Sequence, residues 1–251
     1  VLWGMVLLFL TGIWGDGFTG ASNDKPVGMV VKVKGDVGVK RGGTDKYAVA
    51  EINMPVYQND TVKTLAKSET ELVFDNKIAI KIEPKSTVSV EQIRLNPKLV
   101  DNILRLKSGM MLSDAKHIGG MRIITPVAVV AVRGTLFAVN VDTTGSSEIA
   151  VFRGSVTVSG TNQKETKNIL VNENQRSEVL ENKIPLLPDS LDKRLELYRD
   201  NVALQFELAV VQYREKIDKL IAQRNAWIDN VTQQQNQKID NIKDKQDNML
   251  K

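Results

Sequence analysis

The stretch TPVAVVAVRGTLFAV, residues 125–139, is the segment that decides the fold. With the preceding Ile123 and Ile124 it is almost continuously apolar up to Val132, which predicts a strand covered on both faces. Pro126 should stand at a bend or at a sheet edge, because proline cannot donate a hydrogen bond to a neighbouring strand. We therefore expect this stretch to lie in the core of a β structure.

The surrounding chain, residues 25–184, has short alternating segments separated by glycine, asparagine, aspartate and proline, which is typical of strands and tight turns. It predicts a domain that is essentially all β. Two stretches predict hairpins, and two further segments flank a turn: 31–40 about Gly35-Asp36, 71–82 about Asp75-Asn76, and 137–141 with 148–152 about 143–147.

The amino-acid composition excludes several kinds of functional site. The chain has 251 residues, which suit one large domain or one domain with an accessory element. Cysteine is absent and histidine occurs once, which excludes nearly all sites built on those side chains. We expect no catalytic residue, no metal site and no cofactor. The net charge of +4 comes from 34 basic and 30 acidic residues, too mixed to indicate nucleic acid or an anionic membrane as the partner.

The N-terminal segment, residues 1–24, opens with the uncharged apolar run VLWGMVLLFLTGIW. This run is shorter than the roughly 20 residues of a membrane span and fits the core of an export signal. A buried N-terminal helix and a short membrane anchor are the alternatives. We expect an exported, periplasmic protein with no stable membrane span after signal removal.

Five ordered blocks between residues 35 and 158 resemble the periplasmic domain of the FecR family. The most specific block is the 125–139 stretch, which is similar to the family core "TP-x-x-x-x-VRGT-x-F-x-V". We assign a structural role to the residues that match the family pattern, namely Gly35, Val37, Val39, Asp60, Thr64, Thr125, Pro126, Arg133, Gly134, Thr135, Phe137, Gly154, Val156 and Val158.

The resemblance implies a compact antiparallel β sandwich or roll, and a sensor or protein-binding module rather than a catalyst. FecR-type regulators also carry a cytoplasmic sigma-factor-binding segment and a transmembrane helix before this domain. Only 24 residues precede Lys25, so we expect the chain to lack that segment and do not expect it to signal directly to a sigma factor.

The tripeptide Arg133-Gly134-Thr135 has two interpretations. Glycine could bring backbone amides to an anion with help from Arg133. Alternatively, Gly134 permits a bulge or a close backbone approach while Phe137 and Val139 pack inward.

The C-terminal region, residues 189–251, follows a proline-rich connector at 185–188 and contains no glycine or proline, which predicts a long helix. Its apolar residues recur every 11 positions, a period of about 3.67 residues per turn. The helix could cover the β domain, break into a hairpin near Asn225 or Asn230, or form an arm for a second copy or another protein. The candidate partner-binding residues are Leu195, Tyr198, Val202, Phe206, Ala209, Tyr213, Ile217, Leu220, Ile228 and Val231.

These features predict an exported, non-enzymatic protein that acts as a scaffold or protein-binding component of a periplasmic envelope assembly, such as a flagellum or another appendage. A periplasmic sensor or regulator of transport or sigma-factor signalling is the alternative. Carbohydrate or peptidoglycan binding is a second alternative, disfavoured because residues 25–184 contain no tryptophan to stack on sugars.

Overall fold

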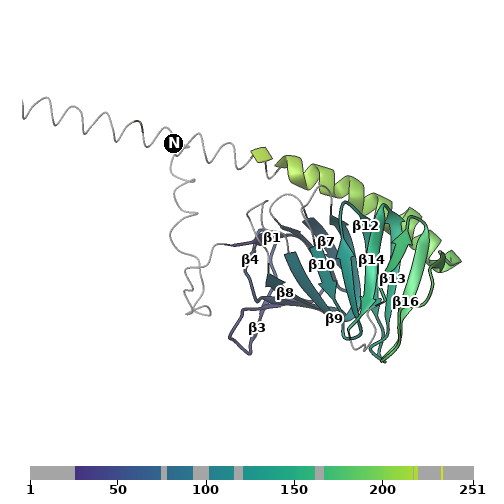
Figure 1. Cartoon of the computed structure of the whole chain (residues 1–251). Coiled ribbons are helices and arrows are strands. Elements are labelled where there is room, and N and C mark those ends of the chain that lie inside the picture. The colour runs from purple at the N-terminus through teal and green to yellow at the C-terminus, as the bar shows by residue number, and fades with distance from the viewer. Residues whose placement is uncertain are drawn as a thin grey trace, which may run out of the picture.

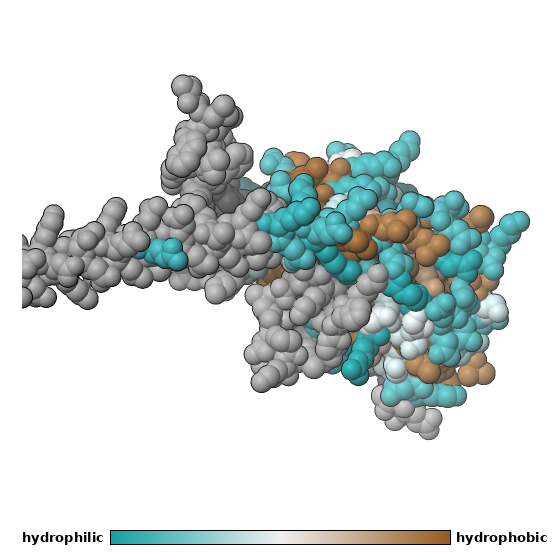
Figure 2. All heavy atoms as spheres, turned by 90° about the horizontal axis from the view of Figure 1, so that it is seen from above, coloured by the Kyte–Doolittle hydropathy of each residue, from teal (hydrophilic) through white to brown (hydrophobic). Residues whose placement is uncertain are grey.

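The computed structural model describes residues 26–74, 78–92, 102–115, 121–161, 167–216, 218–219 and 233. Strands extend from Gly28 to Ser190, and a helix follows over residues 193–216 (Figure 1). Seen from the helix side, the described surface is a mosaic of hydrophilic and apolar patches (Figure 2). The expectation of a mainly β fold followed by a C-terminal helix is confirmed. The predicted export signal and the predicted hairpin turn near Asn225 or Asn230 lie outside the described residues.

In the described part of the chain, seventeen strands form one continuous sheet that folds into two layers. Layer A contains, in spatial order, β4 (Pro55–Val56), β1 (Gly28–Lys34), β6 (Glu69–Phe74), β7 (Ile78–Ile82), the second half of β9 (Asn102–Ala115), β12 (Leu136–Val141), β13 (Ser147–Arg153), β16 (Gln175–Val179) and β17 (Asp189–Ser190).

Layer B lies face to face with layer A. It contains, in spatial order, β3 (Tyr47–Val49), β2 (Val37–Lys40), β5 (Thr61–Thr64), β8 (Thr87–Gln92), the first half of β9, β10 (Met121–Ile124), β11 (Ala128–Val132), β14 (Ser155–Gly160) and β15 (Ile169–Asn172). Neighbouring strands are antiparallel except β9 and β10, which are parallel.

Strand β9 joins the two layers. Its first half pairs with β8 and β10, and its second half pairs with β7 and β12. Gly109 stands at the transition with a φ of +83°, and a Cβ atom there would lie 2.2 Å from the Ser86 hydroxyl oxygen. Glycine alone tolerates both this backbone conformation and this close approach.

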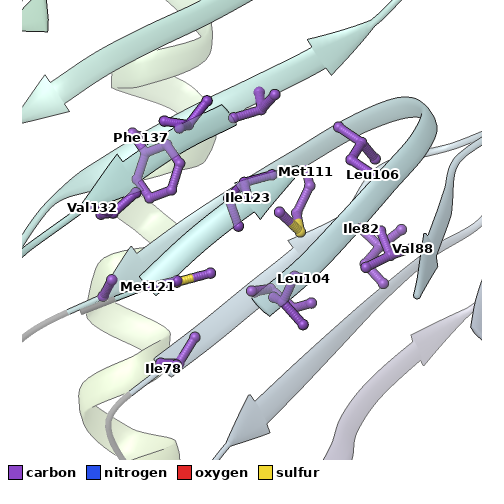
Figure 3. Packing of buried hydrophobic residues seen from close by; sticks show 14 of the residues in the cluster. Ile78, Ile82, Val88, Leu104, Leu106, Met111, Met121, Ile123, Val132 and Phe137 are labelled. Carbon is purple, nitrogen blue, oxygen red and sulfur yellow. The ribbon is translucent and has the colours of Figure 1, made fainter. Parts of the chain in front are cut away.

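The main core fills the space between the layers. Figure 3 shows Leu104 and Leu106 from the first half of β9 beside Met111 from its second half, with Ile123 and Phe137 nearby. These five side chains are at most 1% exposed. Strands β11 and β15 of layer B bury alternate residues, whereas β6 and β7 of layer A are buried at nearly every position. The difference indicates that layer A is covered on both faces.

Two expectations about individual strands are wrong. Gly35 and Asp36 do not close a hairpin, because β1 pairs with β4 and β6 whereas β2 pairs with β3 and β5. Gly35, with a φ of +71°, instead forms a corner where the chain passes between the layers. The apolar run 123–132 is not one strand covered on both faces. It forms β10 and β11, which pair with each other and bury alternate residues.

The predicted antiparallel pairing of β6 with β7 is confirmed, although its predicted turn at Asp75-Asn76 lies outside the described residues. Strands β12 and β13 pair as an antiparallel hairpin about the predicted turn.

The C-terminal helix begins with α1 (Lys193–Tyr198), continues through one π-helical segment, η2 (Arg199–Ala203), and extends over residues 204–216. Asp192 caps its N-terminus, because the Asp192 carboxylate accepts a 2.8 Å hydrogen bond from the Leu195 amide. The helix lies across the outer face of layer A (Figure 1). Within the described part of the chain, no helix is long and apolar enough to cross a membrane.

Candidate functional site

The outer face of layer A, together with the helix that covers it, forms a second hydrophobic core. Leu112, Leu136 and Phe152 of the sheet pack with Leu195 and other apolar side chains of the helix, and all four are at most 7% exposed. The Phe152 and Tyr198 rings lie 6.0 Å apart between centroids. Burial of this apolar surface stabilises the docked helix.

A network of charged and phenolic groups surrounds this second core. The Tyr198 hydroxyl donates a 2.7 Å hydrogen bond to Glu83, and the Tyr213 hydroxyl donates a 2.8 Å hydrogen bond to Glu71. On the sheet, the Lys81 ammonium contacts Glu83 at 2.9 Å and Glu69 at 2.8 Å. These hydrogen bonds therefore fix both the position of the helix on layer A and the direction in which the helix crosses the sheet.

The pKa values in this network follow from these contacts. Burial alone would raise the pKa of Glu69, but Lys81, Lys32 and Lys34 hold it below its usual value. Burial and the neighbouring Glu83 carboxylate raise the pKa of Tyr198 far above that of a free tyrosine. Both shifts favour the ionisation states that make the observed hydrogen bonds.

Asp114 is a second polar contact between sheet and helix, and it is fully buried. Its carboxylate lies 3.6 Å from the Arg153 guanidinium of β13 and 3.5 Å from the Arg214 guanidinium of the helix. Arg153 also donates a hydrogen bond to Glu207 of the helix. Two arginines therefore neutralise a carboxylate whose burial would otherwise be costly.

The structure places half of the candidate partner-binding residues against layer A. Leu195 and Phe206 are buried against layer A, and Tyr198, Val202 and Tyr213 pack beside them. Of the alternatives left open for the helix, covering the β domain describes this part of it, because its apolar rows pack on the chain's own sheet. Ala209 is half-buried, and the side chains of Ile217, Leu220, Ile228 and Val231 lie outside the described residues.

Several family-motif residues hold corners between the layers. Gly35 leaves room for Ser68, whose hydroxyl accepts a 2.8 Å hydrogen bond from the Asp36 amide. The buried Thr64 hydroxyl accepts a 3.0 Å hydrogen bond from the Ser86 amide and donates one of 2.6 Å to the Glu83 carbonyl. These hydroxyls satisfy backbone groups that the corners remove from the strands.

Asp60 is 1% exposed and ties the start of β5 to the preceding turns. Its carboxylate accepts hydrogen bonds from Arg41 and, at 2.8 Å, from the Tyr57 amide, while the Arg41 guanidinium stacks 4.4 Å from the Tyr57 ring centroid. Burial raises the pKa of Asp60, although Tyr57, Arg41 and Gly42 oppose the shift. These contacts give Asp60 a structural place in the fold.

The 125–158 motif residues also occupy corners or the core. The Thr125 hydroxyl accepts 2.8 Å hydrogen bonds from the Ala128 amide and the Ser147 hydroxyl, beside Pro126 in the turn. The Thr135 hydroxyl donates a 2.8 Å hydrogen bond to the Ser155 carbonyl. The motif residues buried in the main core are Val37, Val39, Phe137, Val156 and Val158.

Two glycines explain the Arg133-Gly134-Thr135 tripeptide. Gly134 has a φ of +69° and Gly154 has a φ of +86°, and a Cβ atom at Gly154 would lie 3.1 Å from the Gly134 carbonyl oxygen. The ladder between β12 and β13 shifts register at Leu136 and Phe137. The close-approach interpretation therefore describes this corner, at which Arg133 is exposed.

The outer face of layer B forms a different surface, which the described helix does not cover. Its strands carry five basic residues and one acidic residue: Lys40, Lys63, Arg105, Lys107 and Arg122, with Glu91. Arg105 donates hydrogen bonds to Glu91. The sequence contains a signal for this face, because basic residues alternate with inward-facing apolar residues in VGVK, TVKT and LRLK. Only strand pairing shows that they share one face.

The described residues contain no cluster of three or more histidine, cysteine, aspartate or glutamate side chains suited to a metal ion. The polar residues of the motif are instead engaged with backbone groups at the corners.

Part of the chain matches a known protein family. Residues 60–157 match the family described as FecR protein. This part of the chain is similar to a FecR domain. The match begins at Asp60, at the start of β5, and ends within β14, so it includes strands of both layers.

Two crystal structures of a protein described as a "putative anti-sigma factor" from Parabacteroides distasonis are similar to this chain. One is 12% identical with a TM-score of 0.45, over 53% of this chain and 61% of that chain. The other is 11% identical with a TM-score of 0.46, over 56% of this chain and 64% of that chain. The chain thus spans about three-fifths of those proteins. No curated protein matches it.

Proposed function

We propose that this chain is a non-catalytic regulator or sensor that acts in the periplasm by binding another protein. The FecR match over residues 60–157 is the observation that carries the proposal. Family resemblance implies sensing and protein binding, and the motif's buried hydroxyls and carboxylate serve its corners rather than a reaction.

The location of the helix favours regulation over scaffolding. A scaffold built through the helix would need its apolar rows to face other molecules. Over residues 195–213, these rows contact layer A instead. The described helix leaves the outer face of layer B open, and a protein-binding β domain needs such a surface.

Gene deletion tests the proposal. A regulator or sensor should alter a restricted set of transcripts when it is lost, and re-expression of the wild-type chain should restore them. Transcript sequencing with electron microscopy of the same cells separates the candidates. Unchanged transcripts together with a missing or misassembled envelope structure would overturn the regulatory proposal in favour of a scaffold.

Export is tested separately by fractionating cells and sequencing the N-terminus of the mature protein by mass spectrometry. Recovery from the periplasmic fraction is expected. Recovery only from the cytoplasm would contradict the proposed location.

A further inference from the structure

The outer face of layer B combines apolar and basic side chains in adjacent rows. Strand register places Arg105 opposite Ile124 of β10, and Ile124 opposite Val129 of β11. The next row places Ile103 opposite Arg122, which lies opposite Ala131. Ile103, Ile124 and Val129 are half-buried. The apolar side chains at this centre are therefore neither fully buried in a core nor fully exposed to water.

Basic residues border this apolar centre on the β2, β5 and β9 side. Lys63 lies opposite Gly38 and Thr87, and its side chain is exposed. Lys107, also exposed, follows Arg105 by two residues on β9. The five basic residues and one acidic residue of the layer B strands contrast with five basic and six acidic residues on the layer A strands. Positive charge is thus concentrated on one face.

Layer A shows how a sheet face of this fold holds a helix. Phe206 packs on the sheet, while the adjacent Glu207 accepts a hydrogen bond from Arg153 of β13. An apolar row and an acidic flank on the helix therefore match an apolar strip and a basic residue on the sheet. Layer B presents the same two elements, with as many basic residues as layer A and fewer acidic ones.

We propose that the outer face of layer B binds an amphipathic helix with acidic flanks, supplied by the protein partner. This inference rests on the proposed function, because it assigns a chemical class to that partner. The helix's apolar side would cover Ile103, Ile124 and Val129, and its carboxylates would face Lys63 and Lys107. Charge complementarity selects an acidic partner and accelerates its association.

Fluorescence anisotropy tests the inference with two labelled 18-residue amphipathic peptides. Both carry leucine along one helical face; the other face carries glutamate in one peptide and lysine in the other. The full chain should bind the glutamate peptide at least tenfold more tightly, and raising the salt concentration should weaken this binding. Equal binding of the two peptides would overturn the inference.

Matched charge-reversal variants locate the site. Lys63→Glu/Lys107→Glu should weaken binding of the glutamate peptide at least tenfold. Lys67→Glu/Lys193→Glu changes the net charge equally at exposed positions outside the layer B face and should weaken binding less than threefold. Urea unfolding checks that both variants remain folded. Equal losses of affinity for the glutamate peptide in the two variants would show a general effect of net charge and contradict a binding site on layer B.

Vesicles of phosphatidylcholine and phosphatidylglycerol, mixed three to one, provide the lipid comparison. Vesicle binding that depends on Lys63 and Lys107, with no binding of the glutamate peptide, would overturn the helix proposal in favour of a membrane. Transcript changes on deletion without peptide binding would leave regulation standing and reject this partner class. Peptide binding without transcript changes would support this partner class and reject the regulatory proposal.

Discussion

Layers A and B have the same number of strand segments and share β9, yet their outer faces differ. In layer A, Lys81 pairs with Glu69 and Glu83 beneath the helix. In layer B, Lys63 and Lys107 are exposed on a face with little negative charge. A charged residue that the helix buries needs a partner of opposite charge, because burial without one is costly. A charged residue exposed to solvent needs no such partner. The buried Lys81 on layer A thus supports the fold, whereas the exposed Lys63 and Lys107 on layer B are available for binding.

The largest effect should come from removing the helix's central apolar contact with layer A. Phe206→Ala should lower the free energy of unfolding by about 3–5 kcal/mol, because it leaves a cavity in the second core. Urea denaturation measures this change. Leu208→Ala, at a helix residue that is 62% exposed, should cost less than about 0.5 kcal/mol. Similar losses for both variants would show that the helix is not docked as described.

The two layers should respond differently to loss of a lysine. Lys81→Gln should cost about 3 kcal/mol, because it leaves Glu69 and Glu83 without their shared buried cation. Lys63→Gln should change the stability by less than about 0.5 kcal/mol. Chemical denaturation of both variants at the same salt concentration makes the comparison. A large cost at Lys63 would contradict the distinction between a structural and an open face.

The corner hydroxyls should have an intermediate effect. Thr64→Val keeps the shape of the side chain but removes the acceptor of the Ser86 amide, which should cost about 1–3 kcal/mol. Thr87→Val, on the outward side of layer B, is the matched control and should cost less than about 0.5 kcal/mol. Thermal or urea unfolding distinguishes them, and equal costs would remove the special role assigned to the corner.

The smallest effect at neutral pH should come from Tyr198, and it should grow only in alkali. Its pKa is raised by burial and by Glu83, so the folded chain keeps a proton that an unfolded tyrosine loses near pH 10. The associated stability is fully present below about pH 10 and decreases as the pH rises further. Urea unfolding between pH 8 and 11 should therefore show a shallower alkaline loss for Tyr198→Phe than for wild type.

Absorbance at 295 nm gives an independent measurement, because ionisation of Tyr198 should appear only as the chain unfolds. Early ionisation of this residue in the folded chain would contradict its burial beneath the helix.

Much of the fold could be predicted from local sequence. Alternating residues predicted strand segments within 31–40, 71–82, 137–141 and 148–152, and the 11-residue rows placed Leu195 and Phe206 on one side of a helix. The prediction failed at Gly35-Asp36 because a corner and a hairpin turn use the same residue types. It failed again at residues 123–132, where an apolar run indicates burial but does not reveal which face is covered.

The candidate sites were less accessible from sequence. The motif polar residues were identified, but their hydrogen bonds connect positions such as Thr64 and Ser86, 22 residues apart. The basic face was missed because Lys40, Lys63 and Arg122 lie on separate strands, and the overall net charge of +4 conceals their concentration. Their neighbours depend on strand order rather than on local pattern.

The sequence by itself determined the strand-forming segments, the glycines at the corners and the amphipathic rows of the C-terminal helix, since these follow from backbone sterics and the period of each element. The tertiary structure alone decided which strands form each layer and which face the helix covers. Those choices depend on contacts between distant residues, such as Tyr213 with Glu71. They also decided which charges are buried in pairs and which remain available to a partner.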